Sequence, residues 1–466
     1  MDAMSLKPTL RRMVRATLPL AALAVGLGLS PARAQSLQDA LAQAYTGNPT
    51  LEAARAQLRA TDELVPQARS GYLPTLNAEA DISRSWVDQK GGDTAVVART
   101  SKSVGLTASQ PIYRGGRTGA GVNRAENVVQ AQRASLLSTE QSVLLDAATA
   151  YFDVVQNQAV LDLNVNNEQV LRRQLEASND RFRVGEITRT DVSQSEARLA
   201  GATSSRIQAE GLLNASRATF ARLVGIVPQK LSQPAPTFTL PSTMDETIAL
   251  AEANNPAVVA AKYSEKASDA AVDVVTGELL PTVSLNAQAG RDWGSSSAGA
   301  GRRDVPVDSA AITARVTIPL YEAGNTTSRV REAKQTARQR RIEVDEAARQ
   351  SRENAIRAWE GLVTARATIK SRQAQVRSSE IALEGVRQEA TVGSRTVLDV
   401  LDQEQELLDA RVNLVRAQRD ELVAAFQVLA ATGQLTASRL GLPVQAYDYE
   451  AYYKESRNKL WGVSID

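Results

Sequence analysis

The sequence contains neither cysteine nor histidine among its 466 residues. Without cysteine the chain has no disulfide bond, no thiolate ligand and no thiolate nucleophile. Without histidine it lacks the commonest metal ligand and the commonest general base of enzymes. A hydrolytic triad and an imidazole or thiolate metal site are therefore excluded, and only carboxylate chemistry remains open.

Aromatic residues are scarce as well, at 4% of the chain, and neither sign of charge dominates. The 54 basic and 52 acidic residues leave a net charge of +2, which favours neither nucleic acid nor another polyanion as a partner. Abundant Ala, Gln, Arg, Glu and Leu with few aromatic side chains are typical of long packed helices. Beyond the N-terminal region no stretch is apolar enough for a membrane-spanning helix, so a membrane crossing would have to use β-strands.

The N-terminal residues have the features of an export signal. Four basic residues precede the apolar run 18–29, and Ala32-Arg33-Ala34 places small residues before Gln35. This pattern predicts a signal peptide over 1–34 that is cleaved before Gln35, and the run is too short for a transmembrane helix. The signal has no cysteine to carry a lipid anchor. We expect an exported protein of a Gram-negative bacterium.

The rest of the chain contains two copies of one sequence pattern. The dipeptide Asn-Pro at 48–49 recurs at 255–256, and Leu-Pro-Thr at 73–75 recurs at 280–282, both at a shift of 207. Gly185 and Asp191 recur as Gly393 and Asp399, at a shift of 208. A register this steady through loops indicates an internal duplication. The expected organisation is a first repeat over 35–226 with strands near 74–86 and 102–113, a Pro-rich crossover over 227–242, a second repeat over 243–442 with strands near 281–293 and 309–320, and a C-terminal tail over 443–466.

Apolar and polar residues alternate along each of the four expected strands, as in 76–83 and 310–320. Such alternation fits a barrel wall between lipid and water, and it also fits an ordinary antiparallel sheet with one buried face. Trp86 and Trp293 end equivalent strands, where interfacial aromatics belong. Arg84 and Arg291, two residues before them, would suit the anionic outer surface of an outer membrane. Four strands cannot close a barrel, so several chains would have to share one.

The segments after each strand pair are free of proline over about 121–178 and 327–389. As helices they would each span roughly 80–90 Å. Two adjacent heptad-like seams run along the first of them, which indicates neighbours on both sides, as in a closed layer of helices. A fibrous coiled coil would more often show a single seam.

The duplicated plan and its motifs resemble the TolC family of outer-membrane channel proteins. The resemblance rests on the Asn-Pro of each first helix, on "QPIYRGG" and "IPLYEAG", and on "RFRVGEITRTDV" and "VGSRTVLDVLD". It covers essentially Gln35 to Leu442. It implies a mainly α protein with a small β part, in which each helix-strand-strand-helix protomer joins a homotrimer with a 12-stranded outer-membrane β-barrel on a 12-helix periplasmic α-barrel. It also implies docking, through a periplasmic adaptor (membrane fusion protein), onto an inner-membrane ABC or RND transporter. No enzyme activity, metal or cofactor is expected.

Asp399 and Asp402 stand three residues apart after a Val-Gly turn. This spacing puts both on one helix face, where such a pair could be an acid/base pair, half of a metal site or a solvated surface. The resemblance implies that they form acidic rings at the periplasmic entrance of the channel. Carboxylates held close raise each other's pKa and attract cations, so the rings would favour cations and be blocked by multivalent ones.

The same resemblance implies further site residues. Arg395 corresponds to a gate residue with Asp191 as its carboxylate partner, although Ala390 stands where the family has an aromatic residue. The turns Val184-Gly185 and Val392-Gly393 would meet the adaptor.

Two subclasses of channel fit, type I protein secretion and multidrug efflux. The absence of a lipidation cysteine and the tail 446–466, which resembles those of type I secretion channels, favour protein secretion. A multidrug efflux channel is the alternative. A non-channel periplasmic coiled-coil scaffold and an enzyme using Asp399 and Asp402 are rivals of other classes.

Overall fold

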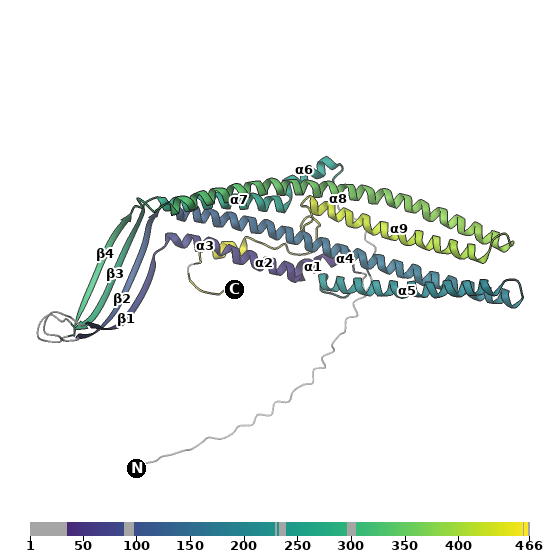
Figure 1. Cartoon of the computed structure of the whole chain (residues 1–466), viewed down its shortest axis with the longest axis horizontal. Helices are drawn as coiled ribbons and strands as arrows, with labels where there is room; N and C mark the ends of the chain where they lie inside the picture. The colour runs from purple at the N-terminus through teal and green to yellow at the C-terminus, as the bar shows by residue number, and fades with distance from the viewer. Residues whose placement is uncertain are drawn as a thin grey trace, which may run out of the picture. The chain divides into compact units, whose positions relative to one another are not determined.

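The computed structural model describes residues 35–87, 97–228, 231–232, 239–295, 304–459 and 461–464. The expected signal peptide, most of the crossover and the middle of the two loops between paired strands lie outside these residues. The protein is mostly helical, with one small sheet (Figure 1).

Both halves of the chain have the same order of elements, helices first, then two strands, then a long helical hairpin (Figure 1). The first half comprises α1 (Leu37–Gly47), α2 (Pro49–Asp62), α3 (Leu64–Arg69), the 3₁₀ turn η1 (Ser70–Tyr72), β1 (Thr75–Val87), β2 (Val97–Arg114), α4 (Arg117–Arg183) and α5 (Arg189–Val224). The second comprises α6 (Met244–Asn254), α7 (Pro256–Thr276), η2 (Gly277–Leu279), β3 (Thr282–Ser295), β4 (Asp304–Thr317), α8 (Asn325–Thr391) and α9 (Val397–Ala431). The tail adds α10 (Ala451–Ser456).

The four strands form one antiparallel sheet in the order β1-β2-β3-β4. Cross-strand rows keep the alternation of the sequence, so that one face is apolar and the other polar. One apolar row runs Leu76, Ala108, Ala287, Ile312, and the polar row beside it begins with Asn77, Thr107 and Gln288. Leu76 and Ile312 are 73% and 78% exposed, so none of the described residues covers these parts of the apolar face.

Two strands differ from the sequence-based bounds. β2 begins at Val97 rather than near 102, because residues 97–101 continue the register with β1 as far as Val87. β4 covers Asp304–Thr317 rather than 309–320. It ends early because Pro319 has no N–H to donate and restricts the backbone of the residue before it.

The first strand pair passes into its long helix α4 through a joint where two glycines meet. A Cβ added at Gly115 would collide with the backbone carbonyl oxygen of Gly277, and one added at Gly277 would collide with that of Gly115. Gly115 also has a φ of +64°, which favours glycine. The joint of the first repeat is therefore in direct backbone contact with the turn η2 of the second.

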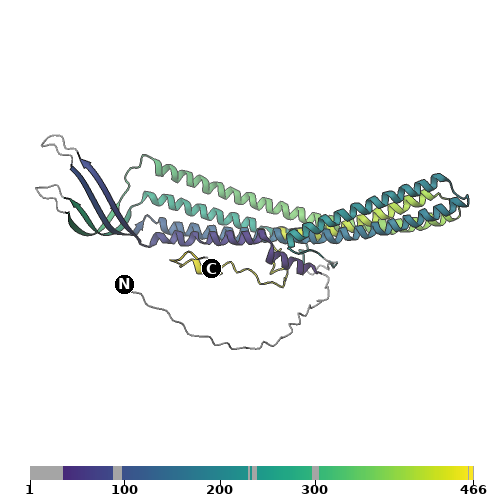
Figure 2. The ribbon, with the colours of Figure 1, turned by 90° about the horizontal axis from the view of Figure 1, so that it is seen from below.

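The helices pack as a layer in which α7 and α9 lie between α4 and α8 (Figure 2). The C-terminal end of α9 meets the N-terminal end of α7, and a single side chain joins them. Asn255 caps α7 by accepting from Ala257 N (2.9 Å), while its Nδ2 donates to the carbonyl oxygen of Ala431 (3.3 Å). Asn48 does the same between α2 and α5, accepting from Thr50 N and donating to Leu223 O, both at 2.9 Å.

The main apolar core lies where α1, α4, α5, α9 and the segment after α9 meet. Tyr151 is fully buried there beside Phe152 and Phe220. Its hydroxyl lies 2.6 Å from the carbonyl oxygen of Ser232 and 3.0 Å from that of Gln35. This one phenol thus ties the start of the described chain and the crossover to the long helix. In the described part of the chain, no helix combines the length and the apolarity that a membrane span requires.

The C-terminal tail packs along α1–α3 and α4. Arg55 lies between the rings of Tyr45 and Tyr447, 4.7 and 5.1 Å from their centroids. Tyr452 donates to Glu63 (2.7 Å). These contacts fix the tail to the first repeat.

Asp62 is buried beside this tail. It is 1% exposed, and neither carboxylate oxygen has a hydrogen-bond partner. Burial raises the pKa of Asp62 to about 6, although the charge of Arg133 opposes the shift. Arg133 in turn lies 5.2 Å from the ring of Tyr453 and 3.6 Å from Glu450 of the tail.

We predict that Asn255→Ala loosens the junction of α7 and α9. The substitution removes an N-cap and a link to a helix C-terminus, at a cost of about 1–2 kcal/mol. The melting temperature of the purified protein should fall, and Asn48→Ala should have a similar effect at the other junction. Exposed Asn458 offers a control, Asn458→Ala; an equal loss there would contradict the special role of the two caps.

Asp62 predicts a pH dependence of stability. Since its folded pKa is raised, its contribution to stability is complete below the unfolded pKa near 4 and is lost as pH rises through about 6. The shift corresponds to roughly 3 kcal/mol. Asp62→Asn should therefore raise the melting temperature at pH 7.5 and leave it nearly unchanged at pH 4. The control Asp269→Asn changes the exposed repeat equivalent and should do neither.

Candidate functional site

The candidate site consists of the two helical turns that join α4 to α5 and α8 to α9. Gly185 and Gly393 both have a φ of +78°, a conformation that glycine adopts without strain. In both turns the N–H after the glycine returns to the last helical turn, Glu186 N to Arg181 O (2.9 Å) and Ser394 N to Glu389 O (3.0 Å). This is the hydrogen-bonding pattern of a Schellman C-cap.

The valine before each glycine projects into solvent. Val184 is 78% exposed and Val392 is 79% exposed. Because the glycine ends each helix within the turn, this apolar side chain is left at the tip instead of being folded against a neighbouring helix. The two turns therefore expose equivalent small apolar side chains.

The helix after each turn begins with a capping box. Asp399 accepts from the N–H and the hydroxyl of Thr396, both at 2.8 Å, while Thr396 Oγ1 accepts from Asp399 N at 3.2 Å. Thr188 and Asp191 make the same reciprocal bonds in the first repeat. The bonds from the Thr396 backbone and side chain hold the pKa of Asp399 below its ordinary value. Those from Thr188 lower the pKa of Asp191. Both carboxylates are thus ionised at neutral pH and engaged locally.

Asp402 is paired with a residue that the sequence analysis did not single out. Arg198 of α5 forms an ion pair with it across to α9, so that Asp402 links the two helical hairpins. Leu171, Ala202, Val397 and Leu401 form a small apolar cluster at the same contact. Ser178 and Ser195, 3.2 Å apart and buried, join α4 to α5 just behind the first turn.

The expected gate pair is not made within the chain. Arg395 Nε lies 2.9 Å from Glu389 Oε2, and Asp191 is held by Thr188. Among the described residues the two partners thus have other contacts inside one protomer, and a link between protomers stays a proposal. The first turn carries the reverse arrangement, since Arg181 pairs with Glu186 at 2.6 Å. Position 181 is basic and its equivalent 389 is acidic.

The four residues expected at a membrane interface gather at the loop end of the sheet. Arg84 lies 5.4 Å from the ring centroid of Trp86, and Arg291 lies 6.0 Å from that of Trp293. Arg291 also pairs with Asp308 of β4 (Nη2–Oδ2 2.7 Å). By the strand register these residues continue the apolar face, so each repeat ends that face with an arginine and a tryptophan.

We predict that Thr396→Ala uncouples Asp399 from its cap. Loss of the hydroxyl removes two bonds of the capping box, at a cost of about 1 kcal/mol, and the pKa of Asp399 should rise toward its ordinary value. A depressed folded pKa contributes stability above the unfolded value that is lost as pH falls through the folded one, so the variant should lose less stability on acidification. Carboxyl ¹³C NMR of labelled aspartates measures the shift. Thr188→Ala is the matched control and should move Asp191 alone; an unmoved Asp399 in Thr396→Ala would reject the assignment.

The chain matches the family described as "Outer membrane efflux protein" over residues 40–226 and 247–434. It is 35% identical over 439 residues to the outer membrane efflux protein BepC of Brucella suis, covering 93% of this chain and 92% of BepC. It is 28% identical to the outer membrane protein TolC of Vibrio cholerae, covering 89% and 94%. Its fold is similar to that of the outer-membrane channel OprN, with a TM-score of 0.75, 21% identity and coverage of 85% and 90%. The chain therefore belongs to the outer membrane efflux protein family, whose members are outer-membrane channels of the TolC type and not enzymes.

Proposed function

We propose that three copies of the chain form one exit channel for type I protein secretion. In this arrangement residues 35–226 and 243–442 act as two quasi-equivalent repeats joined by the crossover 227–242, with 443–466 as a periplasmic tail. The observation that carries the proposal is the open sheet, whose apolar face is exposed and whose outer strands β1 and β4 each pair with only one other strand among the described residues. Strand direction alternates, so β4 of one copy can pair antiparallel with β1 of the next. Three copies give twelve strands, enough for a closed barrel.

The helical layer supports the same assembly. α5 packs against α4, so α5 and α8 are the outer helices of the part of the layer that contains α9, and both carry apolar side chains that are exposed in the single chain. Ile342 and Ile381 on α8 are 60% and 70% exposed, and Ile207 and Leu212 on α5 are 56% and 53% exposed. Apolar side chains on two opposite edges are what a ring of identical protomers would bury at each contact.

At the tips we propose that Asp399 and Asp402 of three copies form acidic rings, with Arg395 and Asp191 as gate residues. Val184-Gly185 and Val392-Gly393 would dock a periplasmic adaptor that connects the channel to an inner-membrane transporter. Arg84, Trp86, Arg291 and Trp293 would lie at the outer interface of the membrane. The depressed pKa of Asp399 supports a charged ring at neutral pH, because its carboxylate does not need to share a proton.

The secretion preference rests on the C-terminal tail and on the absence of a lipid-anchor cysteine. Proteins similar to the chain include one named for secretion, the alkaline protease secretion protein AprF of Pseudomonas aeruginosa, as well as the efflux protein BepC. A drug-efflux channel is therefore the second candidate. Both candidates are channels, so both predict that the purified protein conducts ions across a planar lipid bilayer, and a conductance measurement tests this. A protein that binds the bilayer without carrying current would favour a periplasmic scaffold.

We predict that Asp399→Ala combined with Asp402→Ala lowers the cation preference of the channel several-fold and weakens block by multivalent cations. Three copies lose six carboxylates at the constriction, and a ring of fixed negative charge is what selects cations there. Reversal potentials in asymmetric salt measure the preference. The control removes two exposed aspartates of α7, Asp269→Ala with Asp273→Ala. If both double variants keep the wild-type selectivity, the acidic rings do not exist.

A further inference from the structure

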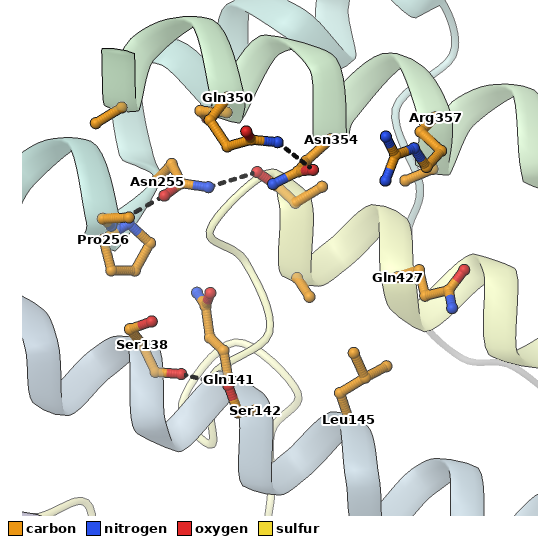
Figure 3. Close-up of a pocket in the computed structure, with 16 residues that line it drawn as sticks. Ser138, Gln141, Ser142, Leu145, Asn255, Pro256, Gln350, Asn354, Arg357 and Gln427 are labelled. Atoms are coloured by element: carbon orange, nitrogen blue, oxygen red, sulfur yellow. Dashed lines mark hydrogen bonds between the residues drawn. The ribbon is translucent and has the colours of Figure 1, made fainter. Parts of the chain in front are cut away.

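A recess of about 500 Å³ lies where α7 meets α9, between α4 and α8 (Figure 3). Five carboxamide side chains and three serines line it, and none of its lining residues is acidic. The carboxamides are Gln141 of α4, Asn255 of α7, Gln350 and Asn354 of α8 and Gln427 of α9. Each carboxamide offers both donors and an acceptor, so the recess is lined by hydrogen-bonding groups from four helices.

Gln141 is the side chain whose position is unexplained by the fold. It is 6% exposed, and its Nε2 has no hydrogen-bond partner. Figure 3 shows its amide directed from α4 into the space below Asn255 and the end of α9. Its neighbours are engaged, since Asn255 joins α7 to α9 and Gln350 donates to Asn354 (3.2 Å). A buried donor without an acceptor is costly, which indicates that the recess receives an acceptor from outside the chain.

The recess opens on the side of the helical layer away from the appended elements. On α4, Ser138 and Ser142 line it, whereas Leu144 and Tyr151 belong to the main core together with residues of α1. With 3.6 residues per turn these two sets lie on roughly opposite sides of the helix. When the layer closes into a ring, as proposed above, the face that carries α1 and the tail is outside and the recess faces the interior.

A second recess of about 660 Å³ continues the first along α4, α7 and α8. Its α4 residues 124, 128, 131 and 135 precede Ser138 in steps of three and four, so both recesses share one helix face. From Arg329 to Arg357 of α8 the two extend over roughly 40 Å, at about 1.5 Å per residue. An extended polypeptide of about a dozen residues has this length.

Three of the four arginines that line the two recesses are paired with a glutamate, and one of them, Arg329, pairs with Glu278 of η2. Arg340 pairs with Glu343 (2.7 Å), and Arg357 is paired with Glu353. Carboxamide and hydroxyl side chains contribute eight of the lining residues of the first recess and five of those of the second. Such groups match the alternating N–H and C=O of an extended backbone.

We propose that this groove binds an extended, uncharged polar stretch of an exported polypeptide, with Gln141 donating to its backbone. The proposal rests on the channel proposed above and names its substrate class. In this proposal the groove binds the exported polypeptide weakly during its passage through the channel. Gln141 then determines specificity at a position far from Asp399 and Asp402.

The test uses a fluorescent dodecapeptide rich in Gln, Ser and Gly. Fluorescence anisotropy measures its binding to the purified full-length protein. Gln141→Leu keeps most of the side-chain volume and removes the donor, and it should raise the dissociation constant about fivefold, as expected for one hydrogen bond. Asn354→Leu, on the facing wall, should act in the same direction. Gln169→Leu changes an exposed glutamine of α4 outside both recesses and should leave binding unchanged.

Melting temperatures confirm that each variant is folded. Failure of the wild-type protein to bind the peptide, or equal binding by wild type and both groove variants, overturns the inference. The proposed channel fails separately, if the protein binds the peptide and carries no current in a bilayer. A peptide that binds and also interrupts the current of wild type, with shorter interruptions in Gln141→Leu, supports both.

Discussion

The arrangement of the helices depends on two junctions. At each junction the end of one helix meets the start of another, and the two continue as one long column. Asn48 and Asn255 each cap the helix that begins with the following proline and donate to the last carbonyl groups of another helix. A helix leaves donors unsatisfied at its start and acceptors unsatisfied at its end. One carboxamide, which carries both kinds of group, satisfies some of each at once. The proline adds a fixed φ and no superfluous donor. Without such a bridge, two abutting helix ends would leave a polar gap in the wall.

The turns between α4 and α5 and between α8 and α9 also satisfy their helix ends with few residues. Both turns use a glycine for the reversal and a Thr-x-x-Asp capping box for the next helix, and their backbones are equivalent. Their ion pairs are reversed in sign, Arg181 with Glu186 and Glu389 with Arg395. Exposed pairs such as these contribute little to stability. Their effect is to give two structurally alike surfaces different charge patterns.

Much of the fold could be predicted from local patterns. The Asn-Pro dipeptides, the alternation near 76–83 and 310–320, and the proline-free segments act within a few residues of where they stand in the sequence, and the structure has helices and strands there. The capping boxes are equally legible in the sequence, since Thr-x-x-Asp before an apolar run is a recognised helix start, whereas the ring role expected for Asp399 rests on the family resemblance. The partner of Asp402 could not be predicted, because Arg198 lies some two hundred residues away and meets it only after two hairpins pack. The burial of Asp62 beside the C-terminal tail could not be predicted either, because no short-range sequence pattern encodes it.

The glycine joint has a consequence for how the protein can change. At most contacts between two side chains, an enlarged residue can be tolerated if its neighbour becomes smaller. At Gly115 and Gly277 the obstacle that each would meet is the main chain of the other, and a main chain cannot be made smaller. No second substitution at the joint can relieve the first. The sheet and the helices are therefore coupled at a point where a larger residue has no compensating change in a neighbouring side chain.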